Sequence, residues 1–274
     1  MQVWQAIVLG VVEGLTEFLP VSSTGHLTVA ERLLGLRIDD PAVTGFTAVI
    51  QIGAIAAVVL ALRTDIHRVS RAWLLSLRRR DAGTPDARLG WIVIVGTIPI
   101  GIAAVLFRDV ITGPLRNLWW VAGALVGWSV VMVLAERFGR QDRGEADLTP
   151  RDGLTVGVFQ AAALVPGISR SGATISGGLF CGVDRVTATR LAFLLAIPAM
   201  SAAAVTELDE ALGAGAGLVP TAIGTFVSFV VAYATVGWLL RFVARHSIVV
   251  FAGYRIAVGA LLLTLLATGT LAAR

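Results

Sequence analysis

Six long apolar runs constrain this chain more than any other feature of its sequence. They cover residues 43–62, 89–107, 118–135, 186–206, 218–240 and 247–268. Crossing about 30 Å of hydrocarbon takes about 20 residues of α-helix. Because lipid offers no hydrogen bonds to the backbone, only helices and closed barrels cross it. The runs therefore predict six transmembrane helices in an all-α integral membrane protein.

The composition agrees with the membrane class. Charged residues make up 15% of the chain, against about 25% in soluble domains, and the mean hydropathy is +0.83. All 22 basic residues are arginines, and they are densest in segment 63–88, between the first two apolar runs. Under the positive-inside rule this segment is typical of a cytoplasmic loop, and that placement argues against nucleic acid as a partner. The single cysteine, Cys181, excludes an intramolecular disulfide.

Two further apolar stretches, about 1–35 and 153–182, carry charges and helix breakers that a lipid-facing helix does not tolerate. The interrupting residues are Glu13, Glu17, Pro20, Pro166, Gly167 and Arg170. At membrane depth, broken backbone is tolerated only inside protein or beside a water-filled cavity. Both stretches are therefore predicted to be re-entrant helix–loop–helix elements.

The two stretches also resemble each other when the first is shifted by 147 residues. The matched pairs are Gly10 and Gly157, Ser22 and Ser169, Gly25 and Gly172, and Gly35 and Gly182. The similarity predicts two halves, 1–140 and 150–274, each with one re-entrant element and three spans. Because three is an odd number, the second half must insert upside down, which makes an inverted repeat within a single membrane domain.

Charge counting sets the expected orientation. With segment 63–88 inside, 15 arginines lie inside and 5 lie outside, and both termini lie outside. Two arginines, Arg170 and Arg255, are left within the membrane region. For Arg255 a structural role is favoured, either reaching for the interface or bridging helices.

Glu13 and Glu17 are the first candidate site residues. They are four positions apart, so on a helix they share one face. Ionisable groups within a membrane are costly and mark functional sites. Two neighbouring carboxylates imply either a shared proton or a divalent metal, and oxygen ligands suit Mg²⁺ or Ca²⁺.

A hydroxyl-rich loop follows, with Ser22, Ser23, Thr24 and His26 after Pro20. The proline helps to end the first half-helix, and the Ser/Thr run is an N-cap signature for the second. Free amides at such a helix start bind anions. The serines and the imidazole can supply a nucleophile and an acid or base. Simple helix capping is the alternative reading of this loop.

The second stretch carries an equivalent loop with an arginine in it. Its polar residues are Ser169, Arg170, Ser171 and Thr174. A guanidinium forks onto phosphate oxygens, although Arg170 could also pair with the glutamates for structural reasons. The two loops together suit a polyanion, a divalent cation and an attack on phosphorus. Gln160 falls on Glu13 under the 147-residue shift and is a further candidate to line the cavity.

The run GVVEGLTEFLPVSSTGH at 10–26 closely resembles the first signature of the undecaprenyl-diphosphate phosphatase family, also called the bacitracin-resistance family. The run PGISRSGAT at 166–174 resembles its second signature. Length, number of spans and inverted halves match as well, so the resemblance covers nearly the whole chain. Another membrane phosphatase class, the phosphatidic-acid phosphatase type, has a signature that begins with lysine, which this chain lacks.

The resemblance implies hydrolysis of undecaprenyl diphosphate to undecaprenyl phosphate and phosphate, with bacitracin resistance as a consequence. It also implies a polyprenyl diphosphate substrate, a divalent metal, the bacterial inner membrane and a site that opens towards the periplasm. The family residues that carry over are Glu13, Glu17, Ser22, Ser23, His26, Ser169, Arg170, Ser171 and Thr174.

The expected roles follow the chemistry of each group. Ser23 attacks the terminal phosphorus or positions a water, Glu17 or His26 takes the proton, and Glu13 and Glu17 hold the metal. Arg170 and the hydroxyls neutralise charge on the transferring group. The choice between Ser23 and His26 as nucleophile stays open, as does the oligomeric state, with a homodimer as one option. The competing hypothesis is a flippase or carrier for polyprenyl phosphate on the same scaffold.

Overall fold

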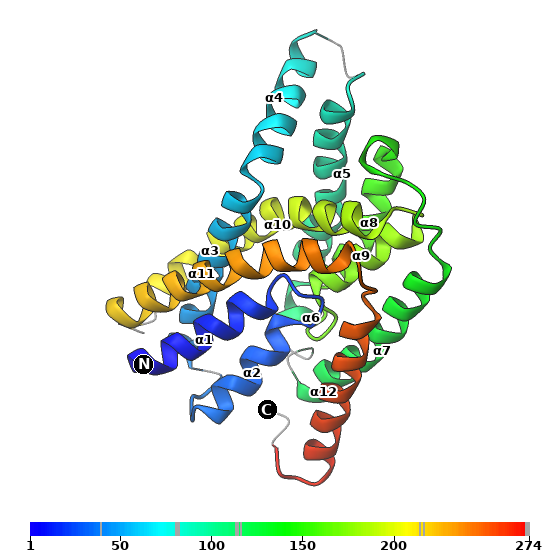
Figure 1. The fold of residues 1–274 in the computed structure, drawn as a ribbon. Coiled ribbons are helices and arrows are strands. Elements are labelled where there is room, and N and C mark those ends of the chain that lie inside the picture. Colours follow the sequence, from blue (N-terminus) through cyan, green and yellow to red (C-terminus); the bar gives the residue numbers. More distant parts are fainter. Residues whose placement is uncertain are drawn as a thin grey trace. The chain divides into compact units, whose positions relative to one another are not determined.

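The computed structural model describes residues 1–38, 40–79, 83–112, 115, 117–213, 215 and 217–271 (Figure 1). Within these residues the chain is helical and forms no named strand. The only bridge of the β type there is an isolated one between Arg143 and Val183. The helices are α1 (Val3–Thr16), α2 (Ser23–Leu33), α3 (Pro41–Ala61), α4 (Arg63–Arg79), α5 (Pro85–Leu106), α6 (Arg108–Thr112), α7 (Leu118–Phe138), α8 (Pro150–Ala162), α9 (Arg170–Phe180), α10 (Arg185–Gly213), α11 (Leu218–Val243) and α12 (Val249–Ala267), with a 3-10 turn, η2 (Glu145–Asp147).

Six of these helices are long and apolar enough to span a membrane, and they confirm the six predicted spans. They are α3, α5, α7, the Arg185–Val205 part of α10, α11 and α12. Between 28% and 50% of each span is buried in the protein, so each also presents apolar side chains outward. Such surface is tolerated when lipid covers it, because lipid tails are as apolar as leucine.

The arginine-rich segment after α3, predicted to be a cytoplasmic connection between two spans, contains a helix, α4. Two of its charged side chains, Arg68 and Asp65, form ion pairs. Arg68 pairs with Asp65, Asp86 and Glu145, and Arg190 of α10 also pairs with Asp65. The helix also has an apolar side, on which Val69 is 7% exposed and Trp73 packs edge-on against Trp91 of α5, so packing as well as ion pairs supports it.

The helices group into two compact units by their contacts. The first unit comprises 1–19, 23–61 and 197–239, and the second unit comprises 20–22, 62–196 and 240–274. Each unit draws on both halves of the sequence. The predicted halves, 1–140 and 150–274, concern chain order and orientation and stay a prediction.

Glycines allow close helix packing inside the first unit. A Cβ added at Gly10 would lie 2.5 Å from the Gly224 oxygen, and one at Gly53 would lie 2.2 Å from the Thr225 oxygen. Small residues let helix backbones approach in the absence of a hydrophobic drive between helices. This packing holds α1 and α3 against α11, beside a small apolar core that includes Phe46.

The second unit is built on two helix pairs. α8 packs along α5, and α12 packs along α7 (Figure 1). A Cβ added at Gly157 would lie 2.3 Å from the Gly96 oxygen, and one at Gly167 would lie 2.3 Å from the Val121 oxygen. The second contact places the loop between α8 and α9 directly against α7.

The two interrupted stretches have matching local structure. Shifting α1 and α2 by 147 residues places them on α8 and α9, with each helix starting at the equivalent position. The residue before each second helix is a serine with positive φ, 77° at Ser22 and 75° at Ser169. Both predicted breaks are thus present and end in a positive-φ serine, although Gly167, with φ 100°, differs in conformation from its equivalent, Pro20.

Candidate active site

The carboxylates lie at the end of α1 in the first unit. Glu13 is 1% exposed and Glu17 is 7% exposed. The Glu17 amide donates to the Glu13 carbonyl, so the helical turn continues to Glu17. The expected arrangement, with both carboxylates four residues apart on one helical turn, is therefore present.

Ser23 opens α2, and its Oγ donates a hydrogen bond to Oε2 of Glu17, 2.5 Å away. A hydroxyl held by a carboxylate is the arrangement that nucleophilic activation requires. His26 follows within the first turn of α2 and is half-buried, whereas Thr24 is exposed. Glu13, Glu17, Ser23, Thr24 and His26 thus share the first unit.

The other candidates belong to the second unit. Ser169 caps α9, accepting from the Gly172 amide at 3.2 Å, and its hydroxyl lies 3.1 Å from that of Ser171. Thr174 is 1% exposed and donates back to the Arg170 carbonyl. Arg170 is the first residue of α9 and is half-buried. Ser22 belongs to the second unit as well.

The carboxylate pair fits a hard divalent cation. Among the described residues there is no group of three or more His, Cys, Asp or Glu side chains that could hold a metal. Mg²⁺ is commonly bound through one or two carboxylates together with phosphates of the substrate and water. Glu13 and Glu17, both buried carboxylates, are the residues that would supply that share of the ligands.

Two further polar side chains are fully buried. Gln160 of α8 is 0% exposed, and neither polar atom of its amide has a hydrogen-bond partner among the described residues. Arg255 of α12 is also 0% exposed. In the sequence, each of these residues stands out as a polar residue inside an apolar element. For Arg255 that signal favoured a structural role rather than a functional one.

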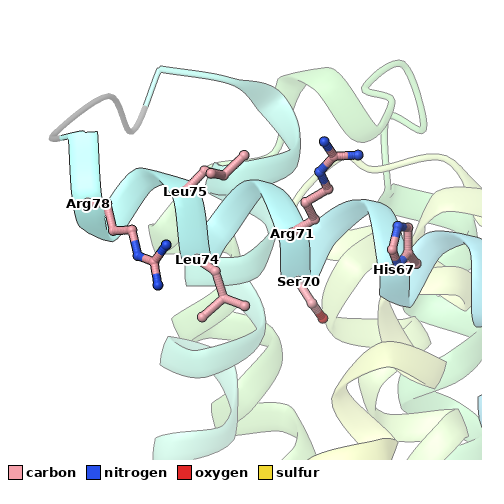
Figure 2. A pocket seen from close by; sticks show the side chains of 6 residues that line it. All are labelled: His67, Ser70, Arg71, Leu74, Leu75 and Arg78. Atoms are coloured by element: carbon pink, nitrogen blue, oxygen red, sulfur yellow. The ribbon is translucent and has the colours of Figure 1, made fainter.

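A surface hollow on α4 contains none of the candidate residues. His67, Ser70, Arg71, Leu74, Leu75 and Arg78 line it (Figure 2). These side chains come from one helix, outside the predicted spans. The hollow is therefore a feature of the charged α4 surface rather than of the interrupted stretches.

These observations define a multi-pass, all-α membrane protein with polar residues at two helix breaks. The model of the family described as bacitracin resistance protein BacA matches residues 6–261. The chain therefore belongs to this family, which confirms the resemblance found in its two signatures.

Curated relatives match over 96–100% of their length. Undecaprenyl-diphosphatase 3 of Frankia casuarinae is 53% identical, with 100% of each chain covered. The undecaprenyl-diphosphatase of Acidothermus cellulolyticus is 54% identical, with 96% of each chain covered. Undecaprenyl-diphosphatase 1 of Streptomyces coelicolor is 54% identical, covering 99% of this chain and 98% of its own.

Proposed function

We propose that this protein is an undecaprenyl-diphosphatase, which hydrolyses undecaprenyl diphosphate to undecaprenyl phosphate and phosphate. Full-length identity above 50% to proteins of that name supports the activity. The observation that carries the chemistry is the hydrogen bond from Ser23 to the buried Glu17 carboxylate. Renewal of the lipid carrier for cell-wall synthesis, and with it bacitracin resistance, follows from this reaction.

The proposed architecture is an inverted repeat of halves 1–140 and 150–274, each with a re-entrant element. The matching helix bounds of α1–α2 and α8–α9 support it, as do the positive φ values of Ser22 and Ser169. In the proposal the residues of the two polar loops act on the same substrate, in the bacterial inner membrane and on its periplasmic side.

In the proposed reaction, the Ser23 hydroxyl attacks the terminal phosphorus as its proton passes to Glu17 or to His26. The bond to the bridging oxygen breaks, and undecaprenyl phosphate leaves with the electron pair. Water then releases phosphate from Ser23. In the alternative course Ser23 only positions the attacking water, or His26 is the nucleophile.

The remaining candidates bind the anionic substrate. Arg170 offers a planar fork of donors to phosphoryl oxygens. The hydroxyls of Ser22, Thr24, Ser169, Ser171 and Thr174 surround the same group. A divalent cation at Glu13 and Glu17, Mg²⁺ or Ca²⁺, would supply charge neutralisation on the diphosphate.

A second candidate function is a flippase or carrier for polyprenyl phosphate. The helix breaks that the two interrupted stretches share favour it, since transporters bind substrates at such breaks. Both activities are compatible with a site reached from alternating sides. A detergent assay separates them, because detergent micelles have no sides and transport gives no signal in them.

The decisive test is phosphate release from a polyprenyl diphosphate by purified protein in detergent, with and without chelator. Chelator is expected to abolish release by the wild type. Ser23→Ala and Arg170→Ala are each expected to lose at least about 100-fold in rate. Release that survives Ser23→Ala but not His26→Ala would move the nucleophile to His26. A folded wild type that releases no phosphate would overturn the enzyme and favour the carrier.

A further inference from the structure

Arg255 of α12 has an unusual position for a charged residue in a span. It is the largest of the fully buried side chains in the described part of the protein. Its hydrogen-bond partners there are four carbonyl oxygens and one hydroxyl, with no carboxylate among them. Burying a charge without a counterion costs several kcal/mol. A residue kept at that cost within a membrane points to a function.

The guanidinium divides its donors between three separate parts of the second unit. Nε donates to Oγ of Ser129 in α7 at 3.1 Å. Nη1 donates to the carbonyl of Pro20 at 3.4 Å, and Nη2 donates to the carbonyl of Gly167 at 2.9 Å. Nη2 also reaches two further α7 carbonyls, those of Ala124 at 3.5 Å and Leu125 at 3.4 Å.

Pro20 and Gly167 occupy equivalent places in the sequence, 147 residues apart. Each lies two residues before a serine with positive φ, Ser22 or Ser169. Each also lies three residues before the first residue of the next helix, Ser23 or Arg170. One side chain thus binds the same carbonyl position in both polar loops.

We propose that Arg255 is a positioning residue that ties the two polar loops together through the carbonyls of Pro20 and Gly167. By fixing those carbonyls against α7, it sets where the chain enters the Ser22–Ser23 and Ser169–Arg170 segments. It touches neither substrate nor reacting atoms. This inference rests on the proposed hydrolytic function for its effect on rate, but not for its effect on the loops.

The requirement is for arginine specifically. A guanidinium carries five donors in a rigid plane, so its nitrogens can serve acceptors that lie in different directions. A lysine keeps the charge but places its donors on one atom. Arg255→Lys therefore separates loop positioning from the charge, and Arg255→Gln removes both the charge and the fork.

The first experiment measures steady-state phosphate release from a polyprenyl diphosphate in detergent. Arg255→Lys is expected to lower kcat by about 10- to 100-fold, with KM within about twofold of wild type, because misplaced groups slow chemistry more than binding. Arg241→Gln, an exposed arginine on α11, is the control and is expected to match wild type. Wild-type kcat in both Arg255 variants, or a raised KM with unchanged kcat, would overturn the proposal.

The second experiment follows amide hydrogen exchange of the same proteins and does not depend on activity. Arg255→Lys is expected to speed exchange in peptides covering 18–24 and 164–172, with little change in α5 and α8, because local opening is separate from global unfolding. Unchanged exchange in both loops, or a uniform increase over the whole chain, would contradict a positioning role. If the wild type releases no phosphate but the variants show the expected exchange pattern, the proposed hydrolytic function is overturned. The proposed positioning of the two loops by Arg255 then still stands.

Ser129→Ala covers the case in which the Arg255 variants fail to fold. It removes the acceptor of Nε and leaves the loop carbonyls in place. A kcat reduced by about threefold to tenfold with unchanged KM supports the proposal. A kcat equal to that of wild type counts against it.

Discussion

At the scale of single residues, the pair of Arg143 and Asp152 anchors the start of α8. Arg143 forks onto the Asp152 carboxylate with two hydrogen bonds, of 2.9 and 2.7 Å. The amide and hydroxyl of Thr149 donate to the same carboxylate at 2.7 and 2.8 Å, which completes a capping box. Burial raises the pKa of Asp152, but the bonds from Arg143 and Thr149 outweigh it, and the net pKa is lowered.

This pair predicts a defined dependence of stability on pH. Because the folded-state pKa of Asp152 is lowered, its contribution is complete above the unfolded pKa of about 4 and is lost as the pH falls through the folded value. Asp152→Asn is expected to cost about 1–2 kcal/mol at pH 7 and much less at low pH. Thermal unfolding in detergent between about pH 3 and 7 measures this.

The control is Asp142→Asn, which breaks a far more exposed pair with Arg140. Its effect is expected to be small at every pH, because exposed ion pairs contribute about 1 kcal/mol or less. Equal losses for the two variants at pH 7 would refute the role given to Asp152.

At the scale of elements, close backbone approach decides how helices pair. Gly157 of α8 faces the backbone of Gly96 in α5, where a Cβ would meet the carbonyl oxygen at 2.3 Å. A Cβ added at Gly101, further along α5, would have no neighbouring atom within 4 Å among the described residues. Gly153 of α8 also lies close to the Ile92 carbonyl of α5, at 2.7 Å from an added Cβ, so the α5–α8 pair depends on close glycine contacts and tolerates change at Gly101.

Gly157→Ala is expected to destabilise the protein by about 1–3 kcal/mol, because the contacted atom belongs to a rigid backbone. Gly101→Ala is expected to leave stability unchanged or to raise it slightly, since alanine favours helix over glycine. Melting temperatures of the two variants in the same detergent test the pair. If Gly157→Ala has the same melting temperature as the wild type, α5 and α8 do not approach each other this closely.

At the scale of the whole molecule, the arginines predict one orientation in the membrane. Segment 63–88 is expected in the cytoplasm, and residue Thr270 near the C-terminus is expected outside. Arg71 and Thr270 are both exposed side chains, so each can be replaced by a single reporter cysteine. A Cys181→Ser background removes the native thiol.

In intact cells, an impermeant maleimide is expected to label Thr270→Cys and to leave Arg71→Cys unlabelled until the cells are opened. The physical reason is the cost of moving an arginine-rich segment across the bilayer. Labelling of Arg71→Cys from outside would reverse the proposed topology and place the proposed site opening on the other face.

The sequence alone determined the membrane class, the six spans, the places of both helix breaks and the family. All of these depend on local signals, because a long apolar run must become a helix in lipid whatever surrounds it. Serines and prolines likewise mark helix ends within a few residues. The signatures at 10–26 and 166–174 were equally readable, since they are contiguous.

Only the tertiary structure decided that segment 63–79 is helical and that Arg255 binds both loops. Arg68 donates a hydrogen bond to Glu145, 77 residues away in the sequence, and Arg255 donates one to Pro20, 235 residues away. In the sequence alone, a charged residue suggests a solvated loop or a membrane interface. The groups that pair with its charge in the folded protein lie far along the chain. Packing brings those atoms together, and no local pattern in the sequence encodes which carbonyl a buried guanidinium will meet.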